Sequence, residues 1–551
     1  MHLRGLTCLL VAAAFLGLAD GALAAPLKPK APDPIPPAHG IMGDSIADPI
    51  AQAIRTALAK AVKAGSDADR HDAAGVVEYY AETGYVPLWT ANGTLTDRAR
   101  GLIARLATAD ADGLDPQALH TPSPDLGKTA RADLPAIADA DVMLSMALVT
   151  YAHQAYAGRL VPGDVSPNIG YQQHVPDAAV TLGSLVLASD PVATLAAYNP
   201  PQKEFAALRD KLAELRRDAA TATQVVIPAG GSLKPGMSDP RLPVIRQRLH
   251  LPAAATDEEV YDDATADAVK SFQRSLKLKA DGVIGGGTLV ALNKPEDNHI
   301  ATVIANMERW RWMPRYLGNF YVRVNIPDFT VDIYKDGNVV HSTRIVVGQP
   351  DKQTPIFSNE IQYIVVNPSW NVPTSIVEKE YLPQLRGGGY PRGFDVFARV
   401  GGRFRAVDPS TVNWRTVSAN DVQFRQPPGE RNALGVIKFM FPNQYAVYLH
   451  DTPSKALFKN DYRAYSHGCM RVMDPWDFAD SLLAQETWNA DRLKKLVGGP
   501  ETQVNLSKHV YVHITYFTAW VDDDGNLQIR NDVYGHDKTM EQELGLLGDK
   551  G

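Results

Sequence analysis

The sequence predicts a multidomain α+β protein with a helical first part, a small three-helix module and a mostly β C-terminal domain that carries an inserted segment. Three observations predict this architecture. Apolar residues recur at helical spacing up to about residue 215, and they alternate with a period of two from about residue 320. Between these regions, Pro235-Gly236 and Lys294-Pro295 bound a short stretch of its own.

The N-terminus predicts export. His2 and Arg4 precede an apolar run from Leu6 to Leu18, and Ala22-Leu23-Ala24 is an A-x-A cleavage site, so we expect a signal peptide over residues 1–24. An uncleaved signal anchor is the alternative, although about 13 apolar residues are short for a membrane span. We expect no lipid anchor and no later membrane-spanning segment. Residues 25–44 are rich in proline and predict an extended linker.

Residues 45–230 predict an all-helical scaffold. The segment from Asp97 to Leu106 places apolar side chains at helical offsets, and the segment from Ile137 to Ala155 is rich in Ala, Leu and Met. A further scaffold helix is expected over residues 297–317, where Met307 and Trp310 stand at helical spacing.

Residues 236–293 predict a compact module of three helices. Leu242, Ile245 and Leu249 share one helix face, and Val269 and Phe272 lie on a second helix. A tight turn at residues 281–285 follows, with Thr288 as the expected N-cap of the third helix.

Residues 318–551 predict a mostly β domain. Strand patterns flank an Asp336-Gly337 turn, and the run from Asp522 to Asn526 predicts another hairpin, because the position where a calcium loop needs glutamate holds Val533. The strand pattern lapses over residues 374–429, which are glycine-rich yet aromatic, so a folded insertion or lid is expected there. The alternative to a lid is a purely structural insertion that has no gating role.

Net charge and cysteine content limit the classes of function that the sequence predicts. The formal net charge of −7 gives no indication of a nucleic-acid or strongly anionic partner. Of the two cysteines, Cys8 lies in the signal, which leaves Cys469 as the single thiol of the exported chain. In an oxidising compartment such a thiol is either buried and inert or reactive.

The surroundings of Cys469 indicate acyl transfer. His450 follows a predicted strand 19 residues before Cys469, and His467 and Arg471 flank the thiol, so a base and a cation are at hand. Gly468 removes bulk before the thiol, which would let the N–H groups of Gly468 and Cys469 approach an oxyanion. Zinc binding by these histidines and the cysteine is a further reading, but no fourth ligand is evident nearby, and we expect no metal and no cofactor.

Two stretches resemble known families. The three-helix module resembles the peptidoglycan-binding domain, on residues Gln247, Thr265, Ala268, Val269, Phe272, Gln273, Asp281, Gly282 and Gly285. The run Leu449-His450-Asp451-Thr452, followed by Ser466-His467-Gly468-Cys469 and Arg471, is similar to the signature of YkuD-type L,D-transpeptidases. The order of signal, helical scaffold, peptidoglycan-binding module and interrupted catalytic domain resembles the large periplasmic YcbB-like subgroup.

The resemblance implies roles for these residues. Cys469 would attack the stem tetrapeptide, release D-alanine and leave a thioester; His450 would be the base and later the acid, with His467 as the competing base. An acceptor amine would then form a 3-3 cross-link, a reaction of cell wall biogenesis and cell shape. Arg471 would hold a substrate carboxylate or lower the thiol pKa, or else form a structural ion pair. Ser466 would hold the loop, and the backbone carbonyl of Asp451, rather than its carboxylate, would orient the imidazole.

The same resemblance sets the expected partners and the alternatives. Peptidoglycan stem peptides and glycan, other wall-synthesis enzymes, covalent inhibition by carbapenems and a periplasmic location are implied. The alternatives are a cysteine L,D-carboxypeptidase or hydrolase, a transferase that attaches a protein or D-amino acid to peptidoglycan, and a noncatalytic wall-binding protein.

Overall fold

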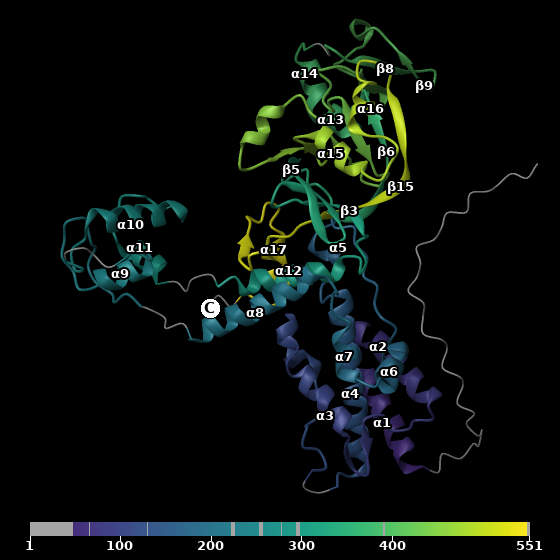
Figure 1. Cartoon of the computed structure of the whole chain (residues 1–551), viewed down its shortest axis with the longest axis vertical. Coiled ribbons are helices and arrows are strands. Elements are labelled where there is room, and N and C mark those ends of the chain that lie inside the picture. Colours follow the sequence, from purple (N-terminus) through teal and green to yellow (C-terminus); the bar gives the residue numbers. More distant parts are fainter. Residues whose placement is uncertain are drawn as a thin grey trace, which may run out of the picture. The chain divides into compact units, whose positions relative to one another are not determined.

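The computed structural model describes residues 48–64, 67–128, 131–221, 226–252, 257–276, 278–293, 298–389 and 392–547. The expected signal peptide and the proline-rich linker lie outside these residues. The observed classes of structure confirm the predicted fold: helices first, then a three-helix module, then a mostly β domain (Figure 1).

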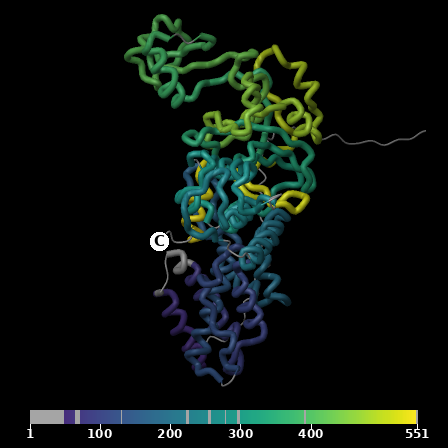
Figure 2. The backbone as a smooth tube through the Cα atoms, turned by 90° about the vertical axis from the view of Figure 1, so that its left-hand side faces the viewer, coloured from purple at the N-terminus to yellow at the C-terminus, as the bar shows by residue number. Residues whose placement is uncertain are grey.

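The helical scaffold packs around one long central helix. Its helices are α1 (Pro49–Ala64), α2 (Asp67–Glu82), α3 (Asp97–Leu106), α4 (Leu134–Ala157), α5 (Pro162–Val165), α6 (Ala178–Leu187), α7 (Pro191–Ala196) and α8 (Lys203–Thr221). The scaffold is not all-helical as expected, because Asn92 and Gly93 take positive φ and turn the chain into a small hairpin of β1 (Thr90–Ala91) and β2 (Thr94–Leu95). The tube in Figure 2 shows the purple and blue helices running alongside one another, and α4 contacts α1, α2, α3 and α6.

The composition of α4 follows from this central place. Among the described helices it is long and apolar enough to cross a membrane, contrary to our expectation that no such segment follows the signal, and 61% of its apolar window is buried. An all-round apolar helix is typical of a protein core as well as of a membrane. Asp141, one of its polar residues, is buried, and its carboxylate accepts hydrogen bonds from Tyr80, Thr90 and the N–H groups of Leu88 and Trp89.

The small module consists of α9 (Leu242–Arg248), α10 (Asp263–Ser275) and α11 (Gly286–Leu292) around its own apolar core. Gln273 is buried, and its amide accepts from Gly282 N–H and donates to the Val283 carbonyl, so it fixes the tight turn. The expectation for Thr288 was wrong: α11 begins at Gly286 with Gly285 as its N-cap, and the Thr288 hydroxyl lies inside the helix, where it accepts from Gln273.

The C-terminal domain is built on a nine-stranded sheet in the order β13-β5-β14-β12-β11-β6-β15-β3-β4. The strands are β3 (Phe320–Asn325), β4 (Thr330–Lys335), β5 (Asn338–Gly348), β6 (Phe357–Val366), β11 (Ile437–Met440), β12 (Leu449–His450), β13 (Ala464–Ser466), β14 (Met470–Val472) and β15 (Thr502–Thr515). The long strand β5 also pairs with β4, so the sheet curls round and its last strand meets its second. Gly337 takes φ +80° in the expected hairpin turn between β4 and β5.

Helices and a C-terminal hairpin complete this domain. They are α12 (Ile300–Trp312), α15 (Pro475–Leu482), α16 (Ala490–Lys494), β16 (Ala519–Val521), β17 (Leu527–Ile529) and α17 (His536–Glu543). Residues of α8 and α12 share an apolar cluster with Tyr321, Tyr334 and Phe517 of the β domain. The predicted hairpin after Val521 is present, although β16 and β17 form a separate two-stranded sheet.

The insertion between β6 and β11 folds as a unit. A four-stranded sheet, in the order β7-β10-β8-β9, packs with short helices around its own core. Its elements are β7 (Trp370–Asn371), α13 (Thr374–Ile376), a π-helical turn (Val377–Tyr381), α14 (Leu382–Arg386), β8 (Asp395–Val400), β9 (Arg403–Ala406) and β10 (Val422–Gln426). The residues expected to form a lid therefore have a hydrophobic core, which a bare loop lacks.

Candidate active site

Two short parallel strands place the thiol beside the histidine. Strand β12 pairs with β14, with Leu449 opposite Met470 and His450 opposite Arg471. Leu449 and Met470 are fully buried in the core. Because successive side chains alternate across a strand, His450, Arg471 and Cys469 share the other face of the sheet. The 18 residues between His450 and Cys469 thus form a connection that leaves the sheet and returns to the neighbouring strand.

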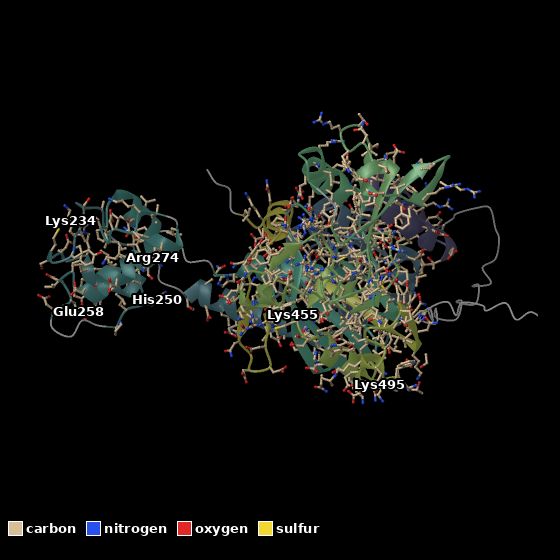
Figure 3. The ribbon with its side chains drawn as sticks, turned by 90° about the horizontal axis from the view of Figure 1, so that it is seen from above. Lys234, His250, Glu258, Arg274, Lys455 and Lys495 are labelled. Carbon is tan, nitrogen blue, oxygen red and sulfur yellow. The ribbon has the colours of Figure 1, made fainter. Side chains whose placement is uncertain are left out.

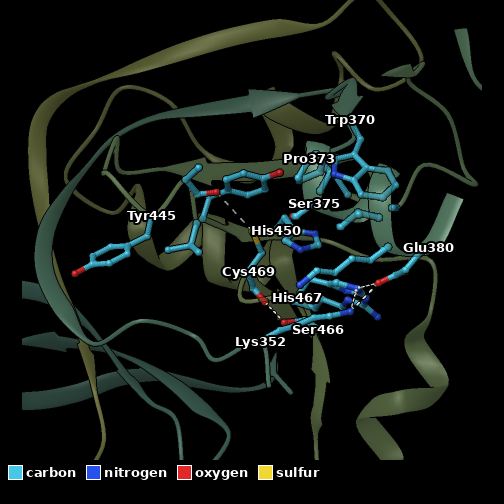
Figure 4. A pocket seen from close by; sticks show the side chains of 18 of the residues that line it. Lys352, Trp370, Pro373, Ser375, Glu380, Tyr445, His450, Ser466, His467 and Cys469 are labelled. Carbon is cyan, nitrogen blue, oxygen red and sulfur yellow. Dashed lines mark hydrogen bonds and ion pairs between the residues drawn. The ribbon is translucent and has the colours of Figure 1, made fainter. Parts of the chain in front are cut away.

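These residues line one cavity of about 390 Å³. Five of the six predicted site residues line it, and Figure 4 labels four of them: His450, Ser466, His467 and Cys469. The fifth is Arg471. The opposite wall comes from the insertion and the residues just before it, with Trp370, Pro373, Ser375, Ile376, Lys379, Glu380 and Tyr381. The expected lid therefore borders the expected catalytic site.

His450 is arranged to act as a base. It is 4% exposed, and its Nδ1 lies 2.5 Å from the backbone carbonyl oxygen of Asp451. A carbonyl can only accept, so Nδ1 carries the proton and Nε2 keeps a free lone pair. Burial, and then the charge of Arg471, lowers the pKa of His450 to about 4, so the imidazole is neutral at pH 7.

The Asp451 carboxylate takes no part in this arrangement. It accepts from the N–H of Val436 at 3.0 Å and pairs with Lys455 at 2.8 Å. The expectation that the backbone carbonyl of Asp451 contacts the imidazole is therefore confirmed, and a protease-like triad is absent from this site.

Cys469 rests as a neutral thiol. Burial raises its pKa from the ordinary 9.0 to about 11, while hydrogen bonds from Tyr448 and the charges of Arg471 and Lys438 oppose that rise. The residue is half-buried, with Sγ 4.0 Å from the Ala446 carbonyl oxygen. Since only the thiolate is strongly nucleophilic, the thiol needs a base at the moment of attack.

Hydrogen bonds hold the loop that presents Cys469. The Ser466 hydroxyl donates to the Cys469 carbonyl at 2.5 Å and accepts from Gly468 N–H at 3.2 Å. Thr354 donates to the Gly468 carbonyl at 2.8 Å, and Gly468 takes φ +113°, which favours glycine. Ser466 thus holds the loop as expected. Because Gly468 N–H already has a partner, Cys469 N–H is left as the backbone donor for an oxyanion.

A second layer ties this loop to the C-terminal segment. The Tyr534 phenol donates to the carbonyl of Gly348 at 2.8 Å and accepts from Thr354 N–H at 3.1 Å. Thr354 in turn accepts from Gly348 N–H at 2.9 Å. Tyr534 therefore contacts the loop that presents Cys469 through Thr354.

His467 faces the insertion. Its Nε2 lies 2.5 Å from a carboxylate oxygen of Glu380 and 2.7 Å from Lys352 Nζ (Figure 4). A carboxylate can only accept, so Nε2 donates its proton to Glu380 and has no lone pair left to accept from Lys352, whose ammonium donates to the same Glu380 oxygen. With Nε2 occupied in this way, His450 is favoured as the base.

Arg471 shares the sheet face with Cys469, and no carboxylate of the described residues is found within ion-pair distance of its guanidinium. The electrostatic partner that acts on it is Cys469, and burial lowers its pKa. The structural ion pair that the sequence left open is therefore not observed among the described residues, and Arg471 stays available for a thiolate or a carboxylate.

Sequence reasoning missed two residues beside the thiol. Lys438 pairs with His450 across β11 and β12, and its Nζ lies 5.4 Å from the centroid of the Tyr448 ring. The Tyr448 ring in turn contacts His450 edge-on at 5.7 Å. A lysine between the buried Ile437 and Phe439 already indicated an outward-facing position. Its register with His450 depends on tertiary pairing, which no local pattern reveals.

Within the described ranges, no group of three or more His, Cys, Asp and Glu side chains lies close enough to hold a metal ion. The zinc reading of His450, His467 and Cys469 thus lacks a ligand set among these residues.

Three family models match the chain. Residues 319–502 match the "L,D-transpeptidase catalytic domain" of the YkuD family, which contains the cavity and its signature residues. The chain carries a YkuD-type L,D-transpeptidase catalytic domain. Residues 74–212 match a "Scaffold domain" and residues 247–292 match a "Putative peptidoglycan binding domain". The L,D-transpeptidase domain thus follows a peptidoglycan-binding domain in one chain, as the sequence resemblance implied.

Individual proteins show the same likeness. A Haemophilus influenzae protein named "Putative L,D-transpeptidase" is 30% identical over 247 residues, which cover 44% of this chain and about half, 50%, of that relative. A solved L,D-transpeptidase from Xylanimonas cellulosilytica is similar at 16% identity with a TM-score of 0.15, covering 52% of this chain and 99% of that one. A solved "Fused Zn-dependent amidase/peptidase/peptodoglycan-binding domain-containing protein" from Clostridium acetobutylicum is similar at 13% identity with a TM-score of 0.13, covering 52% of this chain and 100% of that one. These TM-scores support no argument about the fold.

Proposed function

We propose that the chain is a periplasmic enzyme that cross-links peptidoglycan by L,D-transpeptidation through a thioester on Cys469. The observation that carries this proposal is the parallel pairing of β12 with β14, which sets a neutral His450 and a neutral Cys469 on one face of the sheet inside one cavity. The peptidoglycan-binding domain supports peptidoglycan as the substrate, and the export signal predicted from the sequence supports the periplasm as the compartment.

The acylation step starts from the neutral pair. His450 Nε2 takes the proton as Cys469 Sγ bonds to the carbonyl carbon that precedes D-alanine, and the carbonyl oxygen becomes an oxyanion. Cys469 N–H is the backbone donor left to stabilise that charge, and Arg471 adds a cation on the same face. When the intermediate collapses, the C–N bond breaks and D-alanine leaves with the proton from His450.

The second half-reaction reverses these roles. An amine of a neighbouring stem peptide attacks the thioester carbon, His450 accepts the amine proton, and the C–S bond breaks as the sulfur regains a proton. A diaminopimelate side chain as the acceptor gives a 3-3 cross-link. Water in its place gives a carboxypeptidase, and a protein or D-amino-acid amine gives the other transferases.

Incubation with disaccharide tetrapeptide followed by mass spectrometry tests the proposal. We expect the wild-type chain to release D-alanine and form dimers, and Cys469→Ala to do neither. As a matched control, Lys495→Met changes an exposed lysine at the edge of the molecule, labelled in Figure 3, and should keep full activity.

The products separate the alternatives. D-alanine release without dimers would indicate the hydrolase, and turnover that survives Cys469→Ala would refute the thioester mechanism. Carbapenems should add covalently to the wild-type chain by the same attack, and the mass shift should be absent from Cys469→Ala.

A further inference from the structure

A charged cluster in the wall of the cavity has no role in the chemistry above. One oxygen of the Glu380 carboxylate lies 2.7 Å from Lys352 Nζ and 2.5 Å from His467 Nε2. Lys352 follows β5, Glu380 stands in the π-helical turn of the insertion, and His467 precedes Cys469 (Figure 4). Three distant segments therefore meet at one carboxylate.

This cluster is open to solvent. The side chains of Lys352, Glu380 and His467 are 28%, 35% and 32% exposed. Hydrogen bonding from Lys352, the larger cause, and then from His467 holds the pKa of the Glu380 carboxyl below its ordinary value, so Glu380 is ionised at neutral pH. Ion pairs with this much exposure are weak and exchange readily.

The charge of the cavity favours an anionic ligand. Lys352, Lys379 and Arg471 supply its cationic lining, whereas Glu380 is the one carboxylate among the described lining residues. If another carboxylate took its place, Lys352 and His467 would keep their hydrogen bonds, and the insertion would lose its contact with the cysteine loop.

We propose that Lys352 and His467 form a carboxylate subsite of the active-site cavity, and that Glu380 of the insertion occupies this subsite until a carboxylate of an acidic peptide displaces it. The inference deepens the proposed function and rests on it, because stem peptides present free carboxylates. Glu380 then competes with the substrate carboxylate for the subsite. When substrate binds, the insertion loses its contact with the cysteine loop.

A purely structural latch makes a different prediction. If the cluster only holds the insertion in place, Glu380→Gln and Lys352→Met break the same contact and change binding in the same direction. With a subsite, the two substitutions act in opposite directions: Glu380→Gln removes the competitor, and Lys352→Met removes the recognition.

Equilibrium binding separates these cases without turnover. Disaccharide tetrapeptide is titrated by calorimetry into Cys469→Ala protein that also carries each substitution. Because exposed ion pairs are weak, we expect Glu380→Gln to tighten binding about threefold and Lys352→Met to weaken it about threefold to tenfold. Lys352→Arg keeps the cation and should retain affinity, and Lys495→Met is the charge-matched control.

A peptide with amidated carboxylates completes the test. We expect it to bind more weakly, and Glu380→Gln and Lys352→Met should leave its affinity unchanged. Equal directions for the two substitutions, no effect of either, or effects that persist with the amidated peptide would overturn the subsite. In those cases D-alanine release by the otherwise wild-type chain would leave the proposed function standing; a chain that neither binds nor converts the peptide would overturn both.

Discussion

The resting state of Cys469 can be measured directly, because Cys469 is the single cysteine that remains once the predicted signal peptide, which holds Cys8, is removed. Burial raises the pKa of this thiol from 9.0 to about 11. We predict that iodoacetamide alkylates the folded protein more slowly than the urea-unfolded protein at pH 8, and that the folded rate keeps rising as the pH increases.

The expected ratio of the two alkylation rates follows from two opposing effects. A pKa that is higher by about two units lowers the thiolate fraction at pH 8 by about 100-fold. A more basic thiolate is also more nucleophilic, by about tenfold for two pKa units at a Brønsted slope of 0.4–0.5. The folded chain should therefore react about tenfold more slowly.

Alkylation is followed by the mass of the intact protein between pH 7 and 9.5. The logarithm of the folded rate should rise with a slope near one throughout, whereas the unfolded rate should level off near pH 9. Lys438→Met should slow the folded reaction further, since it removes a charge that favours the thiolate, and Lys495→Met is the exposed control. A folded rate that levels off below pH 8 would show a thiolate at rest and refute this account.

Three further predictions concern the base, the loop and acid stability. His450→Gln should lower kcat for D-alanine release by about 10²–10⁴-fold, and His467→Gln should lower it far less; equal losses would count against His450 as the base. Gly468→Ala should cost about 1–3 kcal/mol of unfolding free energy because φ is +113°, whereas Gly163→Ala, where a Cβ meets open space, should cost much less in the same urea titration. Burial lowers the pKa of His513 to about 4, so its contribution, on the order of 3 kcal/mol, is present above pH 6.5 and lost as the pH falls towards 4. His513→Gln should lose correspondingly less stability than wild type over that range, and an identical pH dependence would contradict the assignment.

Local patterns predicted the elements well where the chain obeys local rules. Helix α3 runs from Asp97 to Leu106 as expected, since Thr96 caps it and its apolar face repeats at helical spacing. The Asp336-Gly337 turn also depends on local chemistry alone. The strand predicted just before His450 is short, Leu449–His450, because Ala446 takes φ +53° and interrupts the extended run.

The residues of the site could be predicted from the sequence, but the contacts between them could not. The motif spacing identified His450 at the end of β12 and Cys469 just before β14, because the residue types and their separation can be read along the chain. The contact between His467 and Glu380 joins residues 87 positions apart, and the register of Lys438 with His450 arises from strand pairing. Such contacts depend on how the insertion packs against the sheet, and this packing produces no periodic pattern in the sequence.

The hydrogen bonds of Tyr534 bear on where a working fragment can end. The family match stops at residue 502, yet β15 begins there and Tyr534 stands beyond it. A protein cut at that border would lose a central strand of the sheet and the phenol that holds Gly348 and Thr354. A working fragment therefore has to extend beyond Tyr534, and tags or fusions belong after Leu546, because Leu544 and Leu546 pack against the apolar cluster of α8 and α12.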